Sequence, residues 1–208
     1  SVPKVWFYCN QQSAETMDDK EVIKKVYERW YTQERFADLW FAPNGKPLIT
    51  KGWNTVWNEN DQLEKTISET FEFRLRQWPT EAFNDNGIPW IEFTYPQPVH
   101  NGWMNVSVAQ HANTVAFSDR EKNWGRGYDF ATGKNDDEHF REGINFKQQW
   151  DTVYGAGDSV QYVFITGWNE WVAEKMIYNG RIQTVDQFDE EYSRDIEPCV
   201  NGFGDNVY

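Results

Sequence analysis

Apolar positions along the chain form either short runs or repeats with a spacing of four residues. Runs and alternating stretches rich in β-branched and aromatic residues predict six strands, at residues 4–9, 48–51, 71–78, 89–95, 105–111 and 160–166. Apolar residues four apart predict three helices, at residues 18–31, 61–70 and 143–154. In the first of these helices, Val22, Val26 and Trp30 are expected on one buried face. Strands that alternate with helices favour a parallel sheet covered by helices.

The fold class that best fits this order is α/β, a (β/α)8 TIM-type barrel. Six strands do not close the usual eight-stranded barrel, so the first two βα units are expected to be missing from this chain or to come from elsewhere. The prediction is therefore a single barrel domain over residues 1–208, with a polar tail at 175–208 packed on it. An open doubly wound sheet is the alternative, although no glycine-rich nucleotide motif follows the first strand.

Composition narrows the class of partner. The 208 residues, 39% of them hydrophobic, suffice for one core, and a net charge of -13 argues against binding the phosphate backbone of nucleic acid. No apolar run reaches the roughly 20 residues of a membrane span. Many of the twelve Trp lie beside polar residues, which suits ligands with apolar faces and hydroxyl edges. A carbohydrate partner is expected, at an extracellular, periplasmic or cell-surface location in preference to the cytoplasm.

Metal and cysteine chemistry have little support in the sequence. The three histidines show no metal-ligand spacing, so neither a catalytic metal nor a cofactor is expected. The acidic stretch 136–138 could hold a structural calcium ion, and a solvated acidic turn is the simpler interpretation. Whether Cys9 and Cys199 pair is left open.

The segment from 160 to 174, VQYVFITGWNEWVAE, carries the functional prediction. A buried strand ends in a glycine and then delivers Asn169 and Glu170, with Trp168 and Trp171 on either side. Aromatic walls partly desolvate a carboxylate, which disfavours its charged form and suits a general acid. The alternative is that the two Trp are packing residues and Glu170 is a structural carboxylate.

A family resemblance supports the functional interpretation. ITGWNEW at 165–171, NFKQQWD at 145–151 and SRDIEP at 193–198 resemble glycoside hydrolase family 99, the (β/α)8 relatives of endo-acting α-mannosidases, and a bacterial branch in particular. The retaining enzymes of that family have an E-W-x-E arrangement. Glu170 and Trp171 match its first two positions, but Ala173 stands at the third, and Glu174 follows one residue later. Glu174 shares a face with Glu170 only if this region is helical.

The predicted activity is glycoside hydrolysis, which needs two carboxyl groups. Glu170 is the first, and Glu174 and Glu92 are the main candidates for the second; Asp129 in the long polar loop is another. Glu92 lies mid-strand and fits an interior structural role as well. Candidate sugar-binding residues lie near the same predicted rim: Asn169, Trp168, Trp171, Trp78, Arg76, Gln97, His111, Arg126 and Tyr128.

Two further expectations complete the prediction. The alternative function is a non-catalytic carbohydrate-binding or surface glycan-assembly protein, favoured by Ala173 and by the missing early strands. In the tail, Arg194 is expected to pair with a carboxylate elsewhere and so to stabilise the fold.

Overall fold

The computed structural model describes residues 2–9, 18–111, 122–169, 175–178, 180–184, 187 and 189–196. The chain divides into two compact units, one of residues 1–77 with 86–88 and the other of residues 78–85 with 89–208. Each unit contains its own hydrophobic cluster. The single domain over 1–208 stays a prediction.

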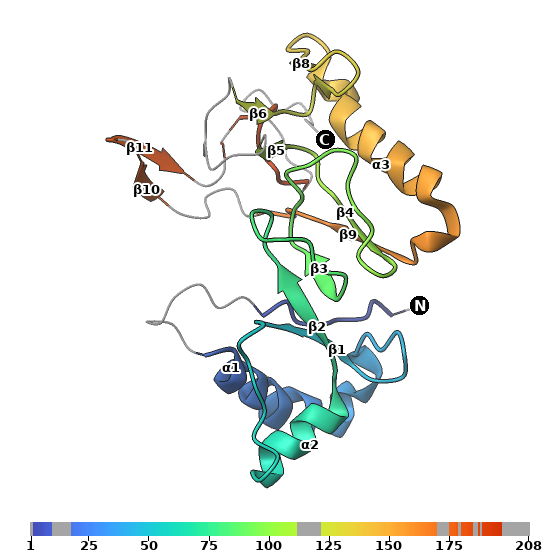
Figure 1. Cartoon of the computed structure of the whole chain (residues 1–208), viewed down its shortest axis with the longest axis vertical. Coiled ribbons are helices and arrows are strands. Elements are labelled where there is room, and N and C mark those ends of the chain that lie inside the picture. Colours follow the sequence, from blue (N-terminus) through green and yellow to red (C-terminus); the bar gives the residue numbers. More distant parts are fainter. Residues whose placement is uncertain are drawn as a thin grey trace. The chain divides into compact units, whose positions relative to one another are not determined.

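The first unit is a small sheet covered by two helices. Its strands are β1 (Leu48–Lys51), β2 (Glu72–Gln77) and β3 (Gly87–Pro89), in the order β1-β2-β3, with β1 and β2 parallel. The helices α1 (Asp19–Val26) and α2 (Gln62–Thr70) lie next to each other on one side of β1 and β2 (Figure 1). The predicted alternation of strand, helix and parallel strand is therefore present locally.

Capping and burial explain both helices. The side chains of Asp18 and Asp61 accept hydrogen bonds from backbone N–H groups of the first turns of α1 and α2, which have no partner within the helix. Each helix then places isoleucine in the core, Ile23 from α1 and Ile67 from α2, against Ile49 of β1. These three side chains are fully buried.

The first helix ends differently from its prediction. A π-helical turn, η1 (Tyr27–Tyr31), follows α1, and the Thr32 N–H bonds to the Tyr27 carbonyl 3.0 Å away, five residues back. The extra residue in this turn shifts the later side chains around the axis. Trp30 is therefore 49% exposed, and Tyr31 takes the inward position against Phe71. The expectation that Trp30 shares the buried face was wrong.

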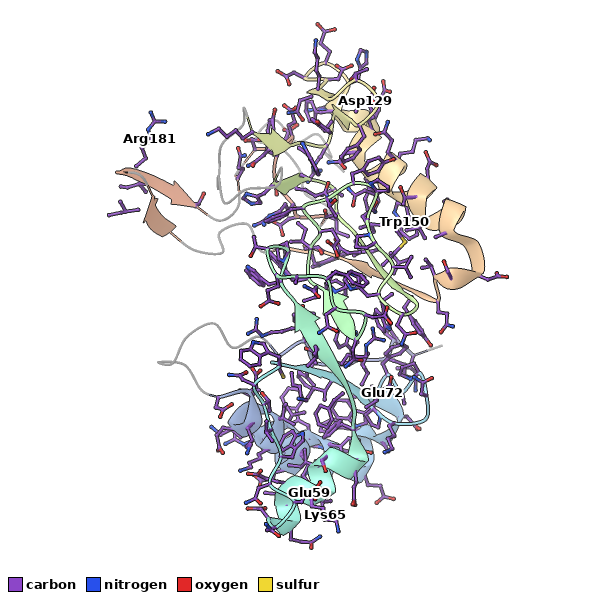
Figure 2. The ribbon with its side chains drawn as sticks, viewed as in Figure 1. Glu59, Lys65, Glu72, Asp129, Trp150 and Arg181 are labelled. Atoms are coloured by element: carbon purple, nitrogen blue, oxygen red, sulfur yellow. The ribbon has the colours of Figure 1, made fainter. Side chains whose placement is uncertain are left out.

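The second unit is built on a parallel pair and one long helix. The strands β4 (Trp103–Val106) and β9 (Tyr162–Ile165) are parallel, and α3 (Ile144–Ala156) packs Val153 against Met104 and Val106 (Figure 1). Short antiparallel pairs make up the remaining strands: β5 (Gln110–His111) with β6 (Asn123–Trp124), β7 (Tyr128–Asp129) with β8 (Lys134–Asn135), and β10 (Lys175–Tyr178) with β11 (Arg181–Thr184). The exposed Arg181 opens β11 (Figure 2).

The predicted (β/α)8 barrel is wrong. The strands of the described residues form one three-stranded and four two-stranded sheets, and none of these is an eight-stranded barrel or a large open sheet. The predicted strand at 89–95 shows the physical reason. Beyond Pro89 its backbone bonds to the Asn105 side chain, which donates to the Trp90 carbonyl at 3.1 Å and accepts from the Glu92 N–H at 3.1 Å. An amide therefore stands where a backbone ladder was expected.

No helix in the described ranges is both long enough and apolar enough to cross a membrane.

Candidate functional site

A cluster of buried amide side chains lies at the centre of the second unit. Asn105 of β4 is fully buried, and its Nδ2 donates to the Phe164 carbonyl at 3.0 Å and to the Thr166 hydroxyl at 2.6 Å, besides the Trp90 carbonyl. Three segments distant in sequence are thereby joined through one side chain. Buried polar groups carry a high cost unless they are bonded, so this arrangement is closely specified.

Gln149 of α3 bonds to backbone in the same way, at Ser107. Its Oε1 accepts from the Ser107 N–H at 2.9 Å, and its Nε2 donates to the Ser107 carbonyl at 2.6 Å. Both backbone groups of Ser107 are satisfied as they would be by a neighbouring strand. Nε2 also donates to Asn145 Oδ1 at 2.7 Å, and Asn145 in turn donates to the Gly125 carbonyl at 3.0 Å.

Gln97, predicted to bind sugar, belongs to this cluster instead. Its Nε2 donates to the Asn105 carbonyl at 3.1 Å and to the Gln149 carbonyl at 3.4 Å, and the side chain is buried. Its Oε1 is buried without a hydrogen-bond partner among the described residues. Gln97 holds β4 against α3.

Glu92 is buried and pairs with His100. Glu92 Oε1 lies 2.9 Å from His100 Nε2, and His100 Nδ1 lies 2.8 Å from the Asn84 carbonyl oxygen. A carbonyl only accepts, so Nδ1 must carry a hydrogen. Nε2 and Oε1 then share a second hydrogen bond, in which either the ring N–H or the carboxyl O–H is the donor. The Phe83 ring stacks on His100 with centroids 4.5 Å apart.

An aromatic pair lies in the same unit as this buried cluster. The rings of Trp78 and Trp90 stack with centroids 5.0 Å apart and planes 7° apart, and both are half-buried. The buried guanidinium of Arg194 lies 5.2 Å from the Trp90 ring centroid. Cation and ring attract each other strongly when they are desolvated.

The end of β9, which leads toward Glu170 in sequence, contacts the same tail segment that places Arg194 near Trp90. The Ile196 N–H donates to the Gly167 carbonyl at 3.0 Å, and a side chain at position 167 would overlap the Arg194 carbonyl. Gly167 has a φ of +76°, which glycine adopts without strain. Trp168, 59% exposed, and the exposed Asn169 follow directly.

Glu170, Trp171 and Glu174 lie outside the residues that the structure describes. Their catalytic and sugar-binding roles therefore stay predictions. Arg76 belongs to the first unit, whereas the remaining described candidates belong to the second.

The other predicted sugar-binding residues have structural contacts. His111 is buried, with its ring 5.3 Å from that of Phe93, and the half-buried Tyr128 stacks on Trp124 at 5.4 Å. Arg126 is buried and donates to two tail carbonyls, those of Ser193 at 3.2 Å and Asp195 at 2.6 Å. Arg126 therefore helps to hold the tail. The ion pair expected between Arg194 and a carboxylate stays a prediction.

The acidic residues of the loop have local partners. Gln148 donates to Asp129 at 2.6 Å, and this bond lowers the pKa of Asp129. Asp129 is labelled in Figure 2. Asp136 pairs with His139 at 2.8 Å, which lowers the pKa of Asp136 and raises that of His139. Within the described ranges, no group of three His, Cys, Asp or Glu side chains is placed to hold a metal ion.

Cys9 is a buried free thiol in the first unit. Burial, with Asp19 nearby, raises its pKa to about 12, so its thiolate is scarce at neutral pH and the side chain is a poor nucleophile. Cys199 lies outside the described residues.

The structure also identifies residues that the sequence interpretation missed. Asn105, Gln149, Trp90 and His100 had no assigned role, yet they organise the second unit. A signal was available for two of them, since Asn105 interrupts an otherwise apolar strand and Gln149 falls between Phe146 and Val153 on the buried side of α3. A polar residue at such a position needs a buried partner.

A scan of protein-family models, a search of curated proteins and a search of solved structures each found no match.

Proposed function

We propose that this chain is a glycoside hydrolase that acts on a polysaccharide or glycan, and that a sugar ring packs on the Trp78–Trp90 pair. The observation that carries the proposal is this pair itself, two half-buried rings that are parallel within 7° and have the Arg194 guanidinium 5.2 Å from one of them. The C–H faces of sugars pack on indole rings, and their hydroxyls accept hydrogen bonds from guanidinium groups. The acidic chain favours a neutral ligand over a polyanion.

The proposed general acid or acid/base is Glu170. It follows Asn169 directly, and Gly167 before it accepts a hydrogen bond from the Ile196 N–H and lies against the Arg194 backbone. The Arg194 guanidinium lies near Trp90. These contacts bring the described residues just before Glu170 in sequence close to the tail that carries Arg194, which supports the proposed role. The resemblance of ITGWNEW to glycoside hydrolase family 99 supports the same role and does not depend on a barrel in this chain.

Glu92 is a weaker candidate for the second carboxylate. Its Oε1 is 2.9 Å from His100 Nε2 and its side chain is buried, so a substrate would have to displace an existing partner. Glu174 is the better candidate. The alternative function, a non-catalytic glycan-binding protein, is favoured by the engagement of Glu92 with His100 and by Ala173 at the family's second catalytic position.

The first test measures binding. Oligosaccharides with α and β linkages are titrated into the intact protein by calorimetry, and Trp78→Ala is compared with the matched control Trp53→Ala. Trp53 is 74% exposed and lies in the first unit. An aromatic stacking contact contributes about 0.5–1.5 kcal/mol, so Trp78→Ala should weaken binding by about two- to tenfold while Trp53→Ala leaves it unchanged.

The second test measures cleavage. Glu170→Gln keeps the shape of the side chain and removes its proton, so turnover should fall by about 10²–10⁴-fold with binding retained. Full activity in this variant would remove Glu170 from the mechanism. Binding without hydrolysis by the wild-type protein would favour the non-catalytic alternative, and no binding to any oligosaccharide would refute the proposal.

A further inference from the structure

The first unit contains a pocket of about 360 Å³ that is separate from the proposed glycan site. We call it the Trp30 pocket; its walls are Val5, Trp30, Phe36, Leu39 and Trp40, and Arg29 and Arg35 also line it. Pockets for small organic ligands begin at about this volume.

The local backbone explains why the pocket forms. The π-helical turn η1 turns Trp30 outward, and η2 (Glu34–Leu39), a 3₁₀ helix, begins three residues after Tyr31. Val5 is held beside the end of η2, because its N–H bonds to the Leu39 carbonyl at 2.7 Å and its carbonyl accepts from the Phe41 N–H at 2.9 Å. The residues that line the apolar hollow therefore come from hydrogen-bonded backbone and from an unusual helical turn. Such π turns are frequent at functional sites.

The charges at the Trp30 pocket differ from those of the rest of the chain. The sequence has 33 acidic and 20 basic residues, yet Arg29 and Arg35 form no ion pair within the described residues. Arg35 lies over the Phe36 ring with its guanidinium carbon 4.5 Å from the centroid. Two cations without counter-ions beside an apolar wall favour an anionic ligand.

The composition of the walls narrows the class of ligand. Five of the seven residues that line the pocket are aliphatic or aromatic, and the other two are arginines. Apolar walls and two guanidinium groups together match a ligand with an apolar body and one anionic end. They do not match a sugar, whose many hydroxyls would find few partners here.

We propose that the Trp30 pocket binds a small amphipathic carboxylate. The apolar body packs between Trp30 and Trp40, and the carboxylate pairs with Arg29 and Arg35. A chain of about eight to ten carbons fits the volume. The binding is independent of glycan cleavage, because every residue it uses belongs to the first unit.

The first test titrates hexanoate, octanoate and decanoate into the full chain by calorimetry, below their micelle concentrations, with octanol as the neutral control. Affinity should rise by about fourfold for each added methylene, as expected for apolar burial. Octanoate should bind at least tenfold more tightly than octanol, and added salt should weaken octanoate alone. Equal binding of octanol and octanoate would overturn the role of the arginines.

The second test uses variants. Arg29→Gln combined with Arg35→Gln should reduce octanoate affinity at least tenfold and leave octanol binding unchanged. The control is Lys65→Gln, an exposed cation on α2 that does not line the pocket (Figure 2). Trp30→Ala should weaken both ligands, because it removes an apolar wall. An equal loss with Lys65→Gln would show that only net charge matters, and no octanoate binding at millimolar concentration would refute the proposal.

Discussion

Gln149→Met tests whether a buried amide replaces a strand neighbour in the second unit. Methionine has the length and flexibility of glutamine and no hydrogen-bonding amide, so packing changes little. The substitution leaves the Ser107 N–H and carbonyl without the partners that they have at 2.9 and 2.6 Å. The experiment therefore isolates the hydrogen bonds from the volume of the side chain.

The expected loss follows from the two backbone groups. A buried polar group left unpaired costs about 1–3 kcal/mol, and burying a thioether in place of an amide returns on the order of 1–2 kcal/mol. For two such groups, the free energy of unfolding should fall by about 1–4 kcal/mol. With a urea m-value of about 2 kcal/mol per M, the midpoint should move down by about 0.5–2 M.

Urea unfolding followed by both circular dichroism and Trp fluorescence measures this shift, and coincidence of the two curves tests for a single transition. The control is Gln161→Met. Gln161 is exposed, and its side chain has no hydrogen bond within the described residues. The free energy of unfolding of Gln161→Met should therefore differ from that of the wild-type protein by less than about 0.5 kcal/mol. A shift below about 0.3 M for Gln149→Met, at an unchanged m-value, would show that Ser107 does not depend on this amide.

Three further predictions concern charge, backbone and tail. Two lysines and a backbone N–H lower the pKa of Glu64 from 4.5 to about 2, so the stabilisation that its carboxylate provides is present above pH 4.5 and is lost as pH falls toward 2. The urea midpoint of the wild-type protein should therefore fall over this pH range, and Glu64→Gln should make that fall less steep. An unchanged slope in the variant would contradict the prediction. Gly167→Ala forces a side chain to φ +76° and should destabilise by at least about 1–2 kcal/mol, whereas the helical control Gly155→Ala should stabilise by about 0.5–1 kcal/mol; thermal melts compare them. Arg126→Lys cannot reach both tail carbonyls and should speed proteolytic cleavage of the tail at least several-fold, with cleavage at the wild-type rate arguing against this contact.

Local structure was largely predictable from the sequence. Apolar spacing located α1 and α2, and β-branched runs located β1 and β9. The strand predicted at 105–111 overlaps β4 only at residues 105 and 106. The π-helical turn was not predictable from the sequence. Trp30 lies four residues after Val26, which suits an α-helix, and Tyr31 lies five residues after it, which suits a π-helical turn, so either aromatic residue could continue the apolar face. Packing of Tyr31 against Phe71 decides between them, and that contact is long-range.

The barrel prediction was wrong because a strand-like sequence pattern does not specify what its backbone will bond to. A run such as 89–95 shows that a segment is buried, but not whether a backbone or a side chain will bond to it. Here the Asn105 amide bonds to the carbonyl of residue 90 and the N–H of residue 92. The same limit applied to the site, where Gln97 and Arg126 looked like rim residues because they are polar. Their donors are used on backbone carbonyls within the second unit.

The buried amide of Asn105 connects the two halves of the proposed glycan site. It donates to the Trp90 carbonyl and to the Thr166 hydroxyl, and the Thr166 hydroxyl itself bonds to the Trp90 carbonyl. Trp90 carries the ring that stacks on Trp78, while Thr166 is the last residue before the glycine that leads to Asn169 and Glu170. One side chain therefore fixes the distance between the stacking surface and the strand end that delivers the proposed acid. Positioning groups of this kind need rigid support because small displacements reduce catalysis steeply, and a fully buried, fully bonded amide supplies such support without contacting the sugar.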